Sequence, residues 1–448
     1  MQILPTIESV LAAISTVVWS EFFLIPILAC TGFYLTLGLR GLQFRFFLES
    51  IKVLWRTRRV KSTEHGDISS IQALMTALSA TVGIGNIVGV AAAIQLGGKG
   101  AVFWMWVVAL LGMATKFSEA VLAVKFREVD NHGYRIGGPM YYIKNGLKSR
   151  WAFLATAFAV FGTIAAFGIG NTVQSNAVAE VLQQYFRIPP SFTGFFLALL
   201  AGLVLIGGIK RIGQVAEKIV PIMALLYISM SLVVLFNRAE AIPNVFTGII
   251  SEAFNTSSVG GAGIWLALRW GFARGIFSNE AGLGSAAIAH AAAKTESPVE
   301  QGMVAMLGTF IDTMVICTIT ALVILVAIPI DNNVPGAILS AKAFEAILGP
   351  LGGNLVAVSI AVFAFTTILG WSYYGEKCAQ FLFGDNVIMR YRVAWIGAIY
   401  FGAIIEFKTV WVIADIFNGL MALPNLIALI LLSPLVFKAV HDYIVSTR

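Results

Sequence analysis

Long apolar stretches separated by short polar segments follow one another along most of the chain. Each stretch is about as long as the ~20 residues that a helix needs to cross the ~30 Å hydrocarbon core of a bilayer. Charged residues, prolines or glycines bound the stretches, whose approximate ranges are 17–39, 68–97, 101–124, 151–186, 190–208, 214–236, 262–290, 300–328, 351–383, 391–406 and 409–437. The pattern predicts an all-α polytopic membrane protein with about eleven transmembrane helices.

Two connections between these stretches, 243–261 and 329–350, are long and apolar. Within them, residues 244–254 and 338–348 carry Val, Phe, Ile and Leu at helical spacing. These segments are either short helices that lie at the membrane surface over an outer vestibule or amphipathic loops.

The composition excludes a soluble enzyme, a disordered chain and a collagen-like protein. The chain is 58% hydrophobic and 12% charged, whereas a soluble domain has about 25% charged residues. Its formal charge is +7, but the Lys and Arg residues lie in short clusters between apolar stretches rather than on a basic domain. The three cysteines have neither metal-ligand spacing nor a disulfide framework, and the four histidines form no metal motif.

The basic residues are distributed unevenly between alternate connections. One side of the membrane would hold 22 Lys and Arg residues and the other side five. Because cytoplasmic connections carry the excess of positive charge, we expect the N-terminus outside and the C-terminus inside the cell membrane. The first 39 residues contain no Lys or Arg, so we do not expect the first apolar stretch to be a cleaved signal peptide.

Two of the stretches are interrupted in the middle by glycines and polar residues. Residues 68–97 would form a helix of ~45 Å, which is too long for one straight crossing, and they contain the segment SATVGIGN at 79–86. The segment GFARGIFSNEAGLG at 271–284 interrupts a second stretch about 192 residues later. Either the glycines allow close helix packing, or both helices are broken, as in transporters built from two inverted repeats.

The second interpretation divides the chain into two inverted five-helix repeats. They would span 68–237 and 262–437, and 17–39 would be an extra N-terminal helix of a single transport domain. A broken helix leaves backbone N–H and C=O groups unpaired in the membrane, where ions and substrate can satisfy them. Half-helix N-termini suit a carboxylate and unwound carbonyls suit Na⁺, so an amino acid with sodium fits better than a sugar.

Three motifs resemble the signatures of the alanine or glycine:cation symporter family, also called sodium:alanine symporters. They are QALMTALSATVGIGNIVG at 72–89, GPMYYI at 138–143 and RGIFSNEAGLGS at 274–285. The resemblance covers about residues 15–440. It implies the amino acid, polyamine and organocation fold of the bacterial leucine transporter, and Na⁺-coupled import of alanine or glycine by alternating access.

The resemblance also implies two sodium sites, because the broken helices of the leucine transporter are similar to these segments. One sodium would bind the carbonyl of Thr81, the side chain of Asn86 and the hydroxyl of Ser278, with Asp312 or Thr313 as a further ligand. A second sodium would bind carbonyls near Ser79 and Val82 and the hydroxyls of Thr366 and Thr367. The leucine transporter has a neutral side chain in place of Asp312, which leaves proton coupling or a different stoichiometry open.

The substrate would lie against the first interruption, at Thr81, Gly83, Ile84 and Gly85. Gln174 resembles the substrate-contacting glutamine of the family, and Asn171 lies on the same stretch. Phe277 and Trp371 could enclose a small apolar side chain. The alternative for the two amides is hydrogen bonding between helices, and for the two aromatic residues it is core packing.

Other charged residues lie at membrane depth. Glu280 is a candidate for cation binding or for a structural ion pair with Arg274, and Lys116 and Glu119 are spaced to pair with each other.

The chain contains no phosphate-binding motif of the G-x-x-x-x-G-K-[ST] type for an ATP-driven pump, and no His lies at membrane depth for an intramembrane enzyme. A channel fits the two inverted halves less well than a symporter does. Glutamine or another neutral amino acid as substrate, and H⁺ as coupling ion, remain alternatives.

Overall fold

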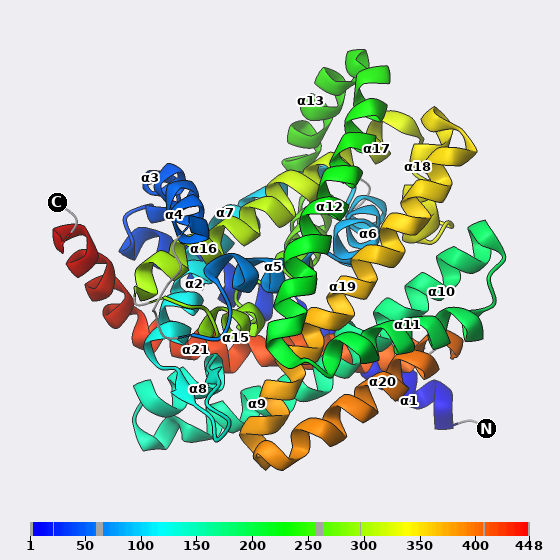
Figure 1. Cartoon of the computed structure of the whole chain (residues 1–448). Coiled ribbons are helices and arrows are strands. Elements are labelled where there is room, and N and C mark those ends of the chain that lie inside the picture. Colours follow the sequence, from blue (N-terminus) through cyan, green and yellow to red (C-terminus); the bar gives the residue numbers. More distant parts are fainter. Residues whose placement is uncertain are drawn as a thin grey trace.

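The computed structural model describes residues 3–20, 22–59, 66–255, 263–295, 297–405 and 408–446. The described chain is almost entirely helical, and its helices cross one another in a bundle (Figure 1). The exception is a small antiparallel hairpin of β1 (Glu128–Val129) and β2 (Arg135–Ile136). The Asp130 carboxylate stabilises its turn by accepting from the backbone N–H groups of His132 and Tyr134.

Among the described residues, seven helical segments are long and apolar enough to cross a membrane, or eight if the bent pair of α5 and α6 counts as one span. The all-helical, multi-span architecture predicted from the sequence is therefore confirmed, whereas the number eleven stays a prediction. The seven segments are Gly100–Lys125 (α7), Ser149–Phe186 (η2 at Ser149–Trp151, then α9, η3 and α10), Gly208–Asn237 (α12), Pro298–Ala327 (α16, η6 and α17), Pro350–Phe383 (α19), Asp385–Ile404 (η7 at Asp385–Val387 and α20 at Ile388–Ile404) and Val412–Ser446 within α21 (Lys408–Ser446).

The bent pair and the shorter elements complete the bundle. They are α1 (Ile3–Val18), α2 (Leu24–Gly38), α3 (Leu42–Arg45), α4 (Phe47–Arg59), α5 (Ser70–Thr81), η1 (Ile84–Asn86), α6 (Val88–Gly97), α8 (Pro139–Gly146), α11 (Pro190–Leu205), η4 (Ala239–Ala241), α13 (Ile242–Ala253), α14 (Gly263–Asn279), α15 (Ser285–Ala291) and α18 (Gly336–Leu348).

Two composite segments contain π-helical turns where the α-helix loosens. The turn η3 (Gly168–Thr172) separates α9 (Ala152–Phe167) from α10 (Val173–Phe186). The turn η6 (Phe310–Cys317) separates α16 (Pro298–Thr309) from α17 (Thr318–Ala327). Because π-helical turns are rare and frequently lie at functional sites, both turns mark regions of interest.

The predicted first span, 17–39, is wrong at its start. The structure places the helix at Leu24–Gly38, and a separate helix, α1, ends at Val18. The chain turns after α1 because α21 holds that end of the helix. The Trp19 indole donates to the Asp415 carbonyl (3.0 Å), and the Ser15 hydroxyl donates to the Asp415 carboxylate (2.9 Å).

The two apolar connections contain helices rather than loops. The helices α13 and α18 cover the expected segments 244–254 and 338–348 to within a few residues. The apolar spacing of these segments favours a helix, because it places apolar residues on one face, which is buried against neighbouring helices.

The long helix α19 packs against helices from several parts of the bundle. It packs against α5 at the first helix break, against η3 and α10, and against α12 and α18 (Figure 1). On another side of the bundle α7 packs against both α14 and α16. These two helices therefore bring the interrupted stretches and both π-helical turns into one region.

Candidate cation and substrate site

The first helix break follows directly from the glycines at 83 and 85. The helix α5 begins with a capping box formed by Ser69 and Gln72 and ends at Thr81, and α6 continues at an angle of 61°. A Cβ atom added to Gly83 would lie 2.3 Å from the Thr367 hydroxyl oxygen of α19. The close approach of α19 therefore requires glycine at this position.

The Asp312 carboxylate connects the first break to the second. It is fully buried in η6. It accepts hydrogen bonds from the Asn86 amide (2.7 Å), the Ser278 hydroxyl (2.7 Å) and the Thr313 hydroxyl (2.8 Å). The Asn86 carbonyl oxygen in turn accepts from the Gly83 backbone N–H (2.9 Å). The structure thus brings Asn86, Ser278, Asp312 and Thr313 together, and their oxygens are the ligand type that a hard cation prefers.

Cys317 also belongs to this cluster, although the sequence did not indicate it. Its sulfur lies 3.1 Å from the Ser278 hydroxyl and 3.4 Å from the Asn86 amide nitrogen. A lone cysteine in an apolar stretch has no motif that would identify it. Asp312 and Cys317 are five residues apart, which is the spacing that a π-helical turn brings together. The sequence alone does not show that both residues lie in such a turn.

Several residues expected at a second sodium site lie at the contact between α5 and α19. Ser79 and Thr367 lie there, where Gly83 meets Thr367 and Gly370 meets Ser79. The hydroxyls of Thr366 and Thr367 both donate to the Phe363 carbonyl of α19 (2.9 and 3.1 Å). The Thr366 hydroxyl also lies 3.6 Å from the Met223 sulfur of α12.

The Gln174 side chain lies beside the first break. Its carbonyl oxygen is within 3.5 Å of the Cβ position at Gly83 and has no hydrogen-bond partner in the described part of the chain. The Gln174 nitrogen donates to the Ile169 carbonyl in the π-helical turn η3 (3.0 Å). An unpaired buried carbonyl is costly, and here it faces the break.

Asn171 is not brought to this site. Its amide nitrogen donates to the Trp395 carbonyl of α20 (2.9 Å), which places it in the contact between helices. Asn171 lies in the π-helical turn η3 and Gln174 follows it in α10, and the position of this turn could not be read from the sequence.

Phe277 and Trp371 lie against the two breaks. The Phe277 ring is 3.3 Å from the Cβ position at Gly85. The Trp371 indole packs against Gly170 and donates to the Glu280 carboxylate (2.8 Å). Glu280 also accepts from Ser285, so its partners differ from the expected Arg274. Arg274 lies instead over the rings of Trp270 (5.3 Å) and Phe277 (5.7 Å).

The second break is held by a carboxylate from α7. Residues 280, 282 and 284 have positive φ angles, which separate α14 from α15. One oxygen of Glu119 accepts from the backbone N–H groups of Gly282 (3.0 Å) and Gly284 (3.1 Å) and from the Asn425 amide (2.7 Å). The expected pairing of Glu119 with Lys116 is therefore not the arrangement observed. The carboxylate oxygen satisfies backbone donors that the break would otherwise leave unpaired.

We expect Glu119→Ala to lower the thermal stability of the purified protein strongly. The substitution leaves two backbone N–H groups and one amide without an acceptor in a fully buried place. Each such group costs ~1–3 kcal/mol. Thermal unfolding in detergent measures the effect, with exposed Glu240→Ala as the control. Equal midpoints for the two variants would contradict the role of Glu119.

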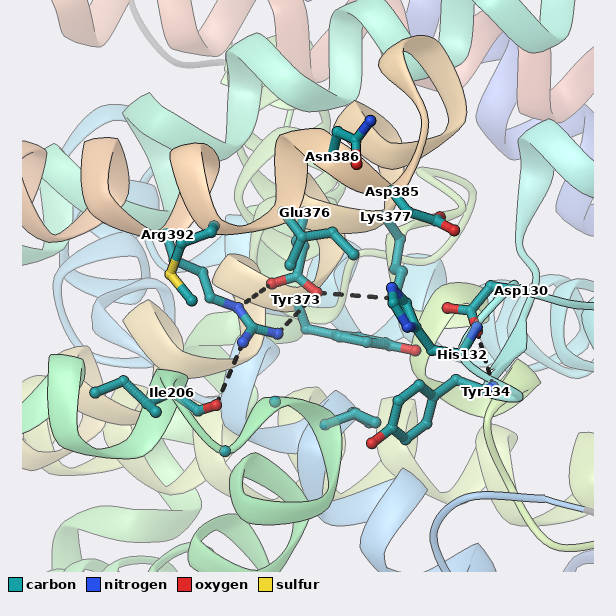
Figure 2. A pocket seen from close by; sticks show the side chains of 15 residues that line it. Asp130, His132, Tyr134, Ile206, Tyr373, Glu376, Lys377, Asp385, Asn386 and Arg392 are labelled. Carbon is teal, nitrogen blue, oxygen red and sulfur yellow. Dashed lines mark hydrogen bonds and ion pairs between the residues drawn. The ribbon is translucent and has the colours of Figure 1, made fainter.

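Two charged cavities lie in the bundle. One, of about 150 Å³, is lined by Trp19 and by residues of α1, α14 and α21 that include Arg274, Phe277 and Asp415. The other, of about 380 Å³, lies where the hairpin, α19 and α20 meet (Figure 2). Phe277 of α14 lines the first cavity, which therefore adjoins a helix that forms a break, and Tyr373 of α19 lines the second.

The larger cavity contains an ion network that the sequence did not indicate. Arg392 donates to both oxygens of Glu376 (2.6 and 3.2 Å), and the Lys377 nitrogen lies 3.7 Å from the same carboxylate. Figure 2 shows Glu376 between these two cations, with Asp130 and Asp385 on the side of Lys377. These ion pairs hold α20 against α19, about two helical turns along α19 from its contact with the first break.

Comparison with known proteins agrees with this architecture. The sequence profile of the sodium:alanine symporter family matches residues 4–448. The chain is 48% identical to the sodium/alanine symporter AgcS of Methanococcus maripaludis, over 96% of this chain and 95% of that protein. It is 38% identical to the probable sodium/glutamine symporter GlnT of Bacillus subtilis, over 98% and 91% of the two chains.

A solved structure shares the fold. The crystal structure of MhsT in complex with L-phenylalanine superimposes with a TM-score of 0.58 at 14% identity, covering 80% of this chain and 89% of MhsT. MhsT has the leucine-transporter fold. Family, relatives and fold are those of multi-pass membrane transporters rather than enzymes. The chain therefore belongs to the sodium:alanine symporter family, whose members carry out cation-coupled amino acid symport.

Proposed function

We propose that this protein imports a small neutral amino acid, alanine or glycine, together with Na⁺ by alternating access. The observation that carries the proposal is the oxygen cluster around Asp312, which links the two broken helices and adjoins the unpaired Gln174 carbonyl through Gly83. An ion and a substrate bound there would each stabilise the same arrangement of both breaks.

The first sodium would bind the carbonyl of Thr81 and the side chains of Asn86, Ser278, Asp312 and Thr313. Its hydroxyl and carboxylate ligands already lie within hydrogen-bond distance of one another. The second sodium would bind carbonyls near Ser79 and Val82 and the hydroxyls of Thr366 and Thr367. These two hydroxyls lie close together, since both donate to the Phe363 carbonyl.

The substrate would occupy the first break. Its carboxylate would accept from the backbone N–H groups around Gly83, Ile84 and Gly85, beside Thr81. Its ammonium group would donate to the unpaired carbonyl of Gln174. Phe277 and Trp371 would limit the size of the side chain, which favours alanine and glycine over larger amino acids.

Transport would exchange access between the two charged cavities. We assign residues 68–237 and 262–437 as two inverted repeats, and 24–38 as the extra helix. The N-terminus would lie outside the cell membrane and the C-terminus in the cytoplasm. The 150 Å³ cavity would then face outward and the 380 Å³ cavity inward.

Glutamine is the second candidate substrate, because the relative from Bacillus subtilis is named as a probable sodium/glutamine symporter. Uptake of labelled alanine into proteoliposomes, with glycine and glutamine as competitors, separates these substrates. Imposed Na⁺ and H⁺ gradients, applied one at a time, separate the coupling ions. Alanine uptake under the Na⁺ gradient alone is the expected result, and uptake driven only by H⁺ would contradict Na⁺ coupling.

We expect Gln174→Ala to raise the alanine concentration for half-maximal uptake at least about tenfold, since one buried hydrogen bond to a charged group is worth ~1.5 kcal/mol or more. The Na⁺ concentration for half-maximal uptake should stay unchanged. Asn171→Ala is the matched control, because Asn171 donates to α20 rather than facing the break. Equal shifts for alanine and Na⁺ in Gln174→Ala would argue against direct substrate contact.

A further inference from the structure

Lys116 is a buried cation that the proposed transport cycle has not used. Its side chain lies on α7 and is only 3% exposed. Its ammonium nitrogen has no hydrogen-bond partner within the described ranges. An ammonium group has three donors, and leaving all of them unpaired inside a membrane protein is costly. Such a group is expected to have a function.

The helical geometry directs Lys116 at the second break. Positions 112, 116 and 119 lie on one face of α7. The Cβ position at Gly112 is 2.8 Å from the Ala281 side chain, and Glu119 accepts from Gly282 and Gly284. Lys116 lies between two residues that both contact residues 281–284, so its side chain extends along the same region.

The positive charge of the Lys116 ammonium group interacts with three carboxylates. The charge of Lys116 acts on Glu119, which holds the second break, on Glu280, which bonds Trp371, and on Asp312 in the oxygen cluster. The charge of Lys116 also acts on the buried imidazole of His290, which is bonded to Gln301 (2.8 Å). Arg274, another buried cation, interacts with Asp415 of α21.

We propose that the Lys116 ammonium is a tethered cation that competes with Na⁺ for the negative charge of these carboxylates and so weakens sodium binding enough for release. A fixed positive charge near the oxygen cluster raises the free energy of a second cation there. Four methylene groups allow the ammonium to approach the carboxylates when Na⁺ leaves and to withdraw when Na⁺ arrives. The inference rests on the proposed function, because it assigns a role within the same sodium site.

The test is Na⁺ binding to purified Lys116→Met, which has a similar volume without the charge. We expect the Na⁺ concentration for half-maximal protection against thermal unfolding to fall about tenfold, since one repulsive charge is removed. Alanine turnover in proteoliposomes should fall as well, because sodium leaves more slowly. General damage to the fold would weaken sodium binding, so tighter binding with slower transport distinguishes the two.

Three further variants complete the experiment. Lys116→Arg keeps the charge and should bind Na⁺ within about twofold of wild type. Lys116→Gln replaces the methionine variant if that variant does not fold. Lys99→Met removes a lysine that pairs with Glu252 at a partly exposed position, and should leave the Na⁺ dependence unchanged.

Unchanged or weaker Na⁺ binding in folded Lys116→Met or Lys116→Gln would overturn the inference while the proposed function stands. Wild-type protein that shows no response to Na⁺ in the binding assay would overturn the proposed sodium coupling and this inference together. A response to Na⁺ in the wild type that becomes about tenfold more sensitive without the Lys116 charge supports both.

Discussion

Gly83→Ala is expected to reduce alanine uptake at least ~100-fold. The added methyl carbon would lie 2.3 Å from the Thr367 hydroxyl oxygen and 3.3 Å from the Thr367 Cβ atom. Both the break and α19 are fully packed here, so relief requires the backbone of 82–87 to move away from α19. In enzyme active sites a misplacement of about 1 Å can cost roughly 100-fold in rate, and we expect a loss of this size here.

Gly89→Ala is the matched control for this substitution. Gly89 lies on α6, six residues further along the same broken helix, and an added Cβ atom there meets nothing within 4 Å. Alanine is also the better helix former, so uptake by this variant should equal that of the wild type. Both variants should be eluted from size-exclusion chromatography as folded protein. Wild-type uptake by Gly83→Ala would contradict the proposed substrate position.

Asp312→Asn should raise the Na⁺ concentration for half-maximal uptake about 100-fold, equivalent to ~2.7 kcal/mol. The variant keeps the shape of the side chain but removes its charge. It also places an amide nitrogen among groups that now donate to Asp312, namely Asn86, Ser278 and Thr313. The two hydroxyls can rotate to accept, but the Asn86 amide nitrogen cannot.

The measurement is alanine uptake as a function of Na⁺ concentration at fixed membrane potential. Asp331→Asn, at an exposed carboxylate on the connection before α18, is the charge-matched control and should show no change. If Asp312→Asn retains the wild-type Na⁺ dependence, Asp312 is not a sodium ligand. If this variant loses its response to pH while keeping its response to Na⁺, Asp312 carries a proton instead.

The helix breaks could be predicted from the sequence because their causes are local. Two glycines within 83–85, and three residues with positive φ within 280–284, interrupt helices through their own backbone preferences. The apolar spacing of 338–348 likewise predicts a helix, since its buried face is a property of that segment alone. These features depend on neighbouring residues rather than on the tertiary fold.

The contacts between side chains that are distant in the sequence could not be predicted in this way. Asn86 and Asp312 are 226 positions apart, and only the resemblance to a known family suggested that they share a site. The hydrogen-bond partners of Asn171 and Glu119 could not be predicted from the sequence either. Asn171 donates to a carbonyl of α20, and Glu119 accepts from backbone donors of the second break rather than from Lys116. Neither partner is visible in the spacing of residues along one helix.

The orientation of a single amide links the ion to the amino acid. The NH₂ group of Asn86 faces Asp312 while its oxygen accepts from the Gly83 N–H. An NH₂ group cannot ligate a cation, so a sodium ion between these residues requires the amide to turn over. The turn breaks the bond to Gly83 and frees that N–H at the position proposed for the substrate carboxylate. Thermodynamic linkage then makes each ligand increase the affinity for the other, and one 180° rotation of Asn86 would couple the two fluxes.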